Sequence, residues 1–209
     1  MKKSACYSAA ALSLLLVGQA IAAVPSTTLK VAGQFGEVGC QIALSGESGE
    51  LKWESVPPSM LHPTKPLTLP GKSKMVNVNC EQATPLSFLI IDNRKGTSDS
   101  SAPQHFGLGN VNQTGKVGHY EAVAAQIKIN GEPADLTTKG YSKSGQWHNF
   151  TPGEVVYWSK SGKPYPAKSF SFELGISPSL ASLKDMGGVP VEGENLLDGS
   201  MTLEFGFGV

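Results

Sequence analysis

The last ten residues, 200–209, read SMTLEFGFGV and alternate apolar side chains with small or polar ones. Side chains of a β-strand point to opposite faces in turn, so one face of this segment would carry five apolar residues: Met201, Leu203, Phe205, Phe207 and Val209. Most domains finish in a loosely held polar tail. We therefore predict an amphipathic β-strand that the protein needs for folding or for contact with a partner. The alternative is an internal strand of a complete sandwich.

The first 22 residues have the layout of a secretory signal. Lys2 and Lys3 give a positive start, residues 9–17 form an apolar run, and residues 20–22 read Ala-Ile-Ala, a small-residue cleavage pattern. The apolar run is too short to cross a bilayer, and no later segment approaches the roughly eighteen apolar residues that a membrane helix needs. The sequence predicts an exported protein without a membrane anchor, whose mature chain begins at Ala23.

The mature chain would hold 187 of the 209 residues, enough for one large or two small domains, and no linker divides it. Without Lys2 and Lys3, the 17 basic residues become 15, against 17 acidic ones. These charges are scattered along the chain. The composition therefore offers no basic patch for nucleic acid or for anionic lipid.

The sequence contains 24 Gly and 14 Pro, a composition that predicts few helices. Strands are predicted from apolar alternation or apolar runs at residues 28–31, 34–44, 74–80, 86–92, 123–129, 134–136, 155–158 and 170–176, and at the final segment. Residues 92–119 are interpreted as a long surface excursion, Asn130-Gly131 as a hairpin turn, and Pro178 as an interruption of the preceding strand. Short strands with turn-rich connections favour an all-β sandwich.

Three cysteines are present, and Cys6 lies within the signal. In an exported protein the remaining pair, Cys40 and Cys80, most simply forms one disulfide. The alternative is two separately buried thiols. A metal site is disfavoured because no histidine or further cysteine lies at ligand spacing.

Residues 28–33 read TLKVAG, Cys40 follows after six residues, and Cys80 lies forty residues further on. In this order and spacing they resemble the start of pilin subunits that are assembled by the chaperone–usher pathway. Residues 67–80, followed by Ala83-Thr84 and by residues 92–94 (Asp-Asn-Arg), are similar more narrowly to the enterobacterial fimbrial proteins called beta-fimbriae. The resemblance runs over residues 28–92 and resumes at residues 123–136 and at the final strand. Thr27 and Gly208 depart from the family pattern.

The resemblance implies an incomplete immunoglobulin-like sandwich over residues 33–209, which lacks its seventh strand and has a Cys40–Cys80 disulfide. The final strand would then border an apolar groove and present an unpaired edge. In the family, a periplasmic chaperone lends a strand first, and the amino-terminal extension of the next subunit replaces it later, a recognised case of β-strand addition.

The donor segment would be residues 23–32, in which Pro25, Thr27, Leu29 and Val31 share one face. The alternative for this segment is a frayed terminus. The partners that the resemblance implies are a periplasmic chaperone, an outer-membrane usher and neighbouring fimbrial subunits. The protein would pass through the periplasm to a fimbrium on the cell surface that serves adhesion, with a host glycan or protein receptor as a further candidate partner.

Other functions have weaker support in the sequence. Trp53, Trp147 and Trp158 would suit a carbohydrate-binding minor subunit or a secreted lectin, although tryptophans are more often core residues. Residues 92–94 form either a recognition feature or a strand-end turn. The four histidines form no HExxH motif and no GxSxG motif occurs, so we predict no enzyme, no metal and no cofactor. The histidines are His62, His105, His119 and His148.

Overall fold

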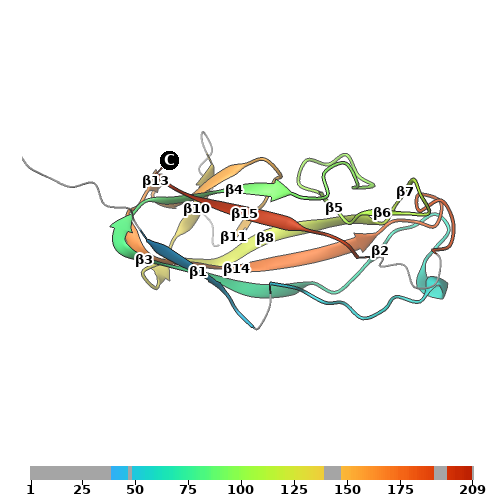
Figure 1. Cartoon of the computed structure of the whole chain (residues 1–209), viewed down its shortest axis with the longest axis horizontal. Helices are drawn as coiled ribbons and strands as arrows, with labels where there is room; N and C mark the ends of the chain where they lie inside the picture. The colour runs from blue at the N-terminus through green and yellow to red at the C-terminus, as the bar shows by residue number, and fades with distance from the viewer. Residues whose placement is uncertain (1–38, 47–48, 139–146, 191–196, 209) are drawn as a thin grey trace, which may run out of the picture. The chain divides into compact units, whose positions relative to one another are not determined.

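The computed structural model describes residues 39–46, 49–138, 147–190 and 197–208, all of which belong to one compact unit, Glu37–Val209. Two main antiparallel sheets face each other across a hydrophobic core (Figure 1). The described part of the chain holds no α-helix and a single short 3-10 turn, Pro58–Met60. The predictions of an all-β protein and of few helices are confirmed.

The first sheet has eight strands. Its main path runs through β1 (Cys40–Leu44), β3 (Lys72–Thr84), β14 (Ala167–Leu180), β8 (Gly118–Ile129) and β11 (Trp147–Asn149). Three short strands attach to this path, β2 (Leu67–Thr68) at β14, and β5 (Phe106–Gly107) and β9 (Glu132–Pro133) at β8.

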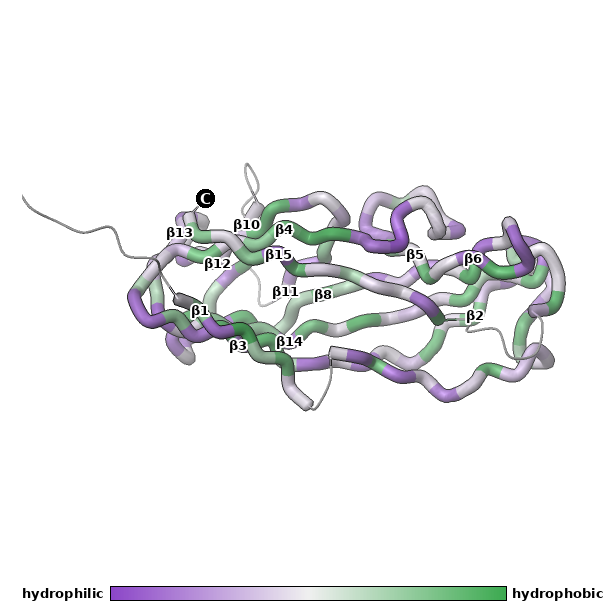
Figure 2. The backbone as a smooth tube through the Cα atoms, in the orientation of Figure 1, coloured by the Kyte–Doolittle hydropathy of each residue, from purple (hydrophilic) through white to green (hydrophobic). Residues whose placement is uncertain are grey.

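The second sheet has five strands. Its path is β10 (Asp135–Thr138), β12 (Val155–Lys160), β4 (Leu86–Asp92) and β15 (Met201–Phe207), with β13 (Lys163–Pro164) beside β12. A separate pair joins β6 (Asn110–Val111) to β7 (Gly115–Lys116). Figure 2 shows β4 as a nearly continuous hydrophobic strand, in which Leu86, Phe88 and Ile90 are buried on one face while Leu89 and Ile91 on the other face are half-buried.

Aromatic rings from both sheets fill the centre of the core. Phe88 of β4 stacks on Phe172 of β14 at a centroid distance of 5.7 Å, and it meets Trp158 of β12 edge-on at 5.2 Å. Trp158 also contacts Phe170 of β14 at 5.1 Å. These four rings are fully buried, so they hold the two sheets together through apolar burial and ring-to-ring contacts.

The Cys40–Cys80 disulfide predicted from the sequence is confirmed, with an S–S distance of 2.04 Å. The two cysteines lie directly opposite each other in the ladder between β1 and β3. The bond therefore fixes β1, an edge strand, to β3, its neighbour in the first sheet.

The interpretation of residues 92–119 as a surface excursion is wrong in part. The segment contains β5, β6 and β7, and four of its side chains are buried in the core: Phe106, Leu108, Val111 and Val117. These apolar residues are separated by polar and glycine positions, so they form no continuous alternation in the sequence. The segment extends the core instead of running over its surface.

The predicted interruption at Pro178 is also wrong, because β14 continues to Leu180. On one side β14 pairs with β3 only up to Ile176, and with β2 only from Ser179. The carbonyl of Pro178 accepts a hydrogen bond from the backbone N–H of Leu69 within this gap. No strand needs a donor at Pro178, so the missing N–H of proline breaks no ladder bond.

The Asn130-Gly131 hairpin is confirmed, but its return strand is short. Asn130 and Gly131 have φ of 51° and 84°, the left-handed values that this two-residue turn requires. Only β9 pairs back onto β8, after which the chain crosses to the second sheet and forms β10. Leu136, predicted on the return, is therefore a core residue of the opposite sheet.

Candidate strand-binding groove

Two edge strands, β1 and β15, lie on the same side of the two-sheet unit (Figure 1). β1 ends the first sheet and pairs only with β3, and β15 ends the second sheet and pairs only with β4. Leu44 of β1 and Met201 of β15 line the same hollow. Within the described ranges, no strand pairs with the free edge of either β1 or β15.

The inward-facing side chains of β1 are apolar and open to solvent. Ile42 and Leu44 lie opposite Val78 and Val76 of β3, which are fully buried, and opposite residues of a ladder point to the same face. Ile42 and Leu44 therefore face inward, yet they are 51% and 41% exposed. They stay exposed because the second sheet ends at β15 and does not extend over β1.

In β15 and the two residues after it, three of the five side chains predicted to face inward do so. Met201, Leu203 and Phe205 are half-buried and pack against the core, where the Phe205 ring lies 5.4 Å from that of Phe88 between centroids. Phe207 shares their alternation but is 58% exposed. It lies opposite Leu86, the first residue of β4, at the end of the ladder, where less of the core lies beneath it. Val209 lies outside the described residues.

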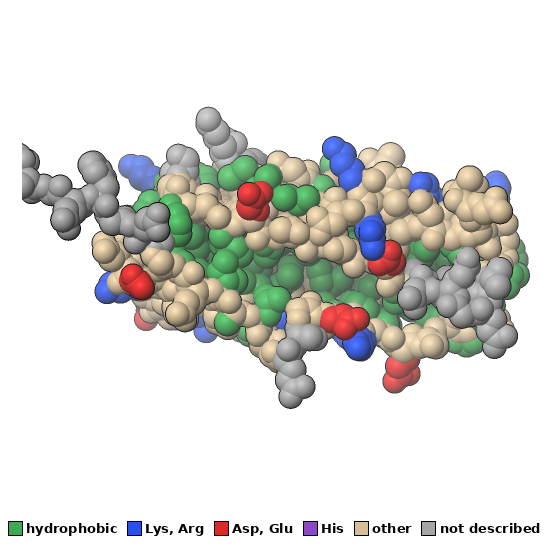
Figure 3. Space-filling view, viewed as in Figure 1, with side chains coloured by type: hydrophobic (Ala, Val, Ile, Leu, Met, Phe, Trp, Pro, Cys, Tyr) green, Lys and Arg blue, Asp and Glu red, His purple; other side chains and the backbone are tan. Residues whose placement is uncertain are grey.

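Figure 3 shows hydrophobic side chains along a hollowed band between the two layers on this face. One end of this band holds a hollow of about 450 Å³. Its lining includes Leu44, Trp53, Leu174, Ile176 and Met201, and its polar lining includes Glu50, Lys74 and Asp198. We call the whole feature, bounded by β1 and β15, the groove.

A buried phenol, Tyr120, also lines the hollow. Burial, and then the negative charge of Asp92, raise the pKa of Tyr120 well above its ordinary value, so the phenol is neutral at physiological pH. Its ring stacks on Phe106 at a centroid distance of 5.0 Å. Tyr120 therefore forms an uncharged aromatic part of the lining of the hollow.

The backbone of β15 presents unpaired polar groups along the groove. The carbonyl of Ser200 accepts from the N–H of Asn93, and the N–H of Gly208 donates to the carbonyl of Pro85, so even-numbered residues face the β4 side. Backbone groups alternate between the two edges of a strand. Met201, Leu203 and Phe205 therefore carry their N–H and C=O groups on the free edge while their side chains enter the groove, which is the arrangement that an added strand needs.

The predicted donor residues Pro25, Thr27, Leu29 and Val31 lie outside the described residues, as do the predicted strand at residues 28–31 and the start of the one at 34–44. The exposed inward-facing side chains of β1 were not identified from the sequence as part of the groove. The only available signal was that Ile42 and Leu44 share the alternation of Cys40.

The tryptophans proposed for sugar binding lie in three different environments. Trp158 is fully buried between the sheets and cannot stack on a ligand, so that assignment is corrected. Trp147 on β11 is 68% exposed. Trp53 donates its indole N–H to the carbonyl of Pro70 at 2.8 Å, and Lys72 lies over its ring.

Three of the four histidines pair with carboxylates. His119 lies 2.7 Å from Asp99, and its ring stacks on that of His105 at a centroid distance of 3.8 Å. The other pairs are His105 with Glu121 at 3.3 Å and His148 with Glu154 at 3.4 Å. Among the residues that the structure describes, no three potential metal ligands gather at one site.

Comparison of the chain with models of known protein families gives no match, and a search of curated proteins finds no matching sequence. In the described part of the chain, no helix is long and apolar enough to span a membrane.

Proposed function

We propose that the protein is a structural subunit of a surface fimbria and has no catalytic role. In this proposal the unit is an immunoglobulin-like sandwich without its seventh strand, and the groove receives that strand from a periplasmic chaperone and later from a neighbouring subunit. The observation that carries the proposal is the free backbone edge of β15 beside an exposed apolar groove. The signal-like start of the chain and the resemblance to pilin subunits support it.

An unpaired strand edge beside an apolar groove makes an isolated subunit prone to aggregation. Such an edge pairs readily with other chains, and exposed apolar patches promote association. A strand added between β15 and β1 would satisfy the free N–H and C=O groups and cover Ile42 and Leu44 in the same step. The two features therefore favour one kind of ligand, an extended peptide segment with apolar side chains at alternate positions.

The proposed donor is residues 23–32 of another copy of the chain. Burial of Leu29 and Val31 would contribute about 1.5–3 kcal/mol each, whereas ordering a peptide backbone costs about 1–2 kcal/mol per residue. Two apolar side chains do not offset the ordering of ten residues. Main-chain hydrogen bonds along β15, each worth about 0.5–1.5 kcal/mol, are therefore a necessary part of the binding.

Co-expression with and without a periplasmic fimbrial chaperone tests this function. We expect the subunit to be degraded or aggregated alone and to be recovered as a one-to-one complex with the chaperone. A stable, monodisperse monomer that forms no complex would contradict the proposal.

A polar substitution in the groove is expected to weaken strand binding without unfolding the protein. We predict that Ile42→Asp lowers the affinity for a peptide of residues 23–32 by at least about tenfold, since the charge would lose water on binding. Its free energy of unfolding should change by less than about 1 kcal/mol, because the side chain is 51% exposed. Peptide titration and urea denaturation measure the two quantities.

Val155→Asp is the matched control for this prediction. Val155 is also a β-branched residue on a strand and is 49% exposed, but its neighbour Val156 is buried in the core, so Val155 faces away from the groove. Val155→Asp should bind the peptide as wild type does. Equal losses in the two variants would show that the peptide binds elsewhere.

One observation favours the carbohydrate-binding alternative, the exposed indole of Trp147. A glycan array probed with wild type and with Trp147→Ala tests it. Specific glycan binding that the substitution abolishes would favour a lectin-like role.

A further inference from the structure

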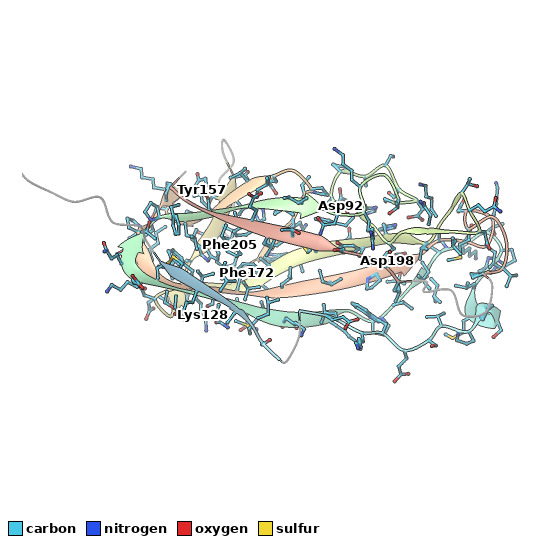
Figure 4. The ribbon with its side chains drawn as sticks, in the orientation of Figure 1. Asp92, Lys128, Tyr157, Phe172, Asp198 and Phe205 are labelled. Atoms are coloured by element: carbon cyan, nitrogen blue, oxygen red, sulfur yellow. A yellow bond between two sulfur atoms is a disulfide. The ribbon has the colours of Figure 1, made fainter. Side chains whose placement is uncertain are left out.

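The corner that follows β4 holds the beginning of β15. The Arg94 guanidinium donates from Nε to the carbonyl of Asp198 at 2.9 Å and from Nη2 to the Asp198 carboxylate, with Oδ1 at 2.7 Å and Oδ2 at 2.6 Å. Charge-assisted contacts of this kind are directional as well as attractive. In Figure 4, Asp92 marks the end of β4 and Asp198 the approach to β15.

Asn93 adds a second set of contacts to the same segment. Its backbone N–H donates to the carbonyl of Ser200 at 3.0 Å, and its side-chain Nδ2 donates to the hydroxyls of Ser200 and Thr202, both at 3.0 Å. We call Asn93, Arg94 and Asp198 the corner clamp.

The corner that carries the clamp is itself fixed by Asp92. One carboxylate oxygen of Asp92 accepts from the N–H of Arg94 at 2.9 Å, and the other accepts from the N–H of Gly107 at 3.0 Å. Residues 92–94 therefore form a strand-end turn, as one interpretation of the sequence had it, and the same residues reach across to β15. Asp92 therefore connects the turn that carries the clamp to β5 as well as to β4.

Support of this kind matters because β15 has a neighbour on one side only. At its far end, the hydroxyl of Ser87 donates to the carbonyl of Gly208 at 2.9 Å. At its near end, Asp198 and Ser200 belong to the lining of the hollow and precede the first ladder residue, Met201. Apart from the clamp, the rim of the groove at this end is held by the hydrogen bond from Asp198 N–H to the carbonyl of Leu108 and by the packing of Leu197 and Met201 against the core.

We propose that Asn93 and Arg94 are positioning residues of the groove, which hold the first half of β15 against β4 so that its free edge can receive a strand. This inference rests on the proposed function. Arg94 and Asp198 are both partly exposed, and exposed ion pairs contribute little to global stability. The effect of the clamp should therefore be local, on the opening of residues 198–203, and not on the unfolding of the whole domain.

Hydrogen exchange in the free full-length protein, refolded at low concentration, tests the inference. Arg94→Ala is expected to speed the exchange of the Asp198 and Thr202 amides, which point toward Leu108 and β4, by about tenfold or more, and to leave residues 170–176 of β14 unchanged. The reversed pair, Arg94→Asp with Asp198→Arg, should restore a large part of the protection. Lys95→Ala is the control, a neighbouring cation outside the clamp that should exchange as wild type does.

Titration of the same variants with a peptide of residues 23–32 connects the clamp to the groove. Arg94→Ala should weaken binding by roughly fivefold or more, with recovery in the reversed pair. Unchanged exchange of the Asp198 and Thr202 amides in Arg94→Ala would overturn the inference, as would faster exchange with unchanged peptide affinity. If the wild type bound no peptide, the proposed function would fail, and the exchange data would still decide whether the clamp holds β15.

Discussion

Replacement of Trp158 by alanine is expected to lower the free energy of unfolding by about 3–5 kcal/mol, the range for removing a large aromatic side chain from a packed core. Trp158 is fully buried and contacts Phe88 and Phe170 at centroid distances of 5.2 and 5.1 Å. Its removal would leave a cavity where the two sheets meet. Urea denaturation followed by circular dichroism measures the change.

Trp158→Phe is the control for this prediction. It keeps an aromatic ring at the centre of the core, and it removes an indole N–H that has no hydrogen-bond partner among the described residues. An unsatisfied buried donor carries a desolvation cost, so its removal offsets part of the lost apolar contact. We expect Trp158→Phe to cost clearly less than Trp158→Ala. Similar, small losses in both variants would contradict the central position of Trp158 in the core.

Loss of the Cys40–Cys80 disulfide is expected to lower the free energy of unfolding by about 4 kcal/mol, on the chain-entropy account for a loop of this length. The two cysteines are separated by 40 residues, and the bond also fixes the edge strand β1 to β3. Denaturation of the Cys40→Ala, Cys80→Ala double variant against the oxidised wild type measures the effect.

Reduction of the wild type provides the control, because it breaks the same bond without changing the sequence. The reduced wild type and the double variant should unfold at similar denaturant concentrations, both well below the oxidised protein. Hydrogen exchange in β1 should also increase, since this strand has a neighbour on one side only. If reduction left the midpoint of unfolding unchanged, the stabilising role of the disulfide would be contradicted.

The strands with the clearest patterns were predicted well from the sequence. β4 spans the predicted residues 86–92, since a short continuous run of apolar residues is typical of a strand. β14 and β8 were recognised but underestimated in length. Pro178 lies inside β14, at a gap between two partner strands, and this tolerance depends on which strands flank it and not on local propensity.

The groove could be predicted only in part. The alternation in residues 200–209 indicated which side chains of β15 face inward, but not that Phe207 would stay exposed at the end of the ladder. The exposure of Ile42 and Leu44 depends on where the opposite sheet ends, which is a property of topology. Likewise, the contacts of Arg94 with Asp198 join residues about a hundred positions apart, which local patterns do not reveal.

The central claim is that the groove accepts a β-strand along the free edge of β15, and the most direct test is amide exchange at that edge. Residue-resolved hydrogen exchange would be recorded for the free protein and after addition of a peptide of residues 23–32, with a Leu29→Asp, Val31→Asp peptide as control. The account predicts that the N–H groups of Leu203 and Phe205 exchange rapidly in the free protein and become protected only with the unmodified peptide. Strong protection of both groups in the free protein would contradict it.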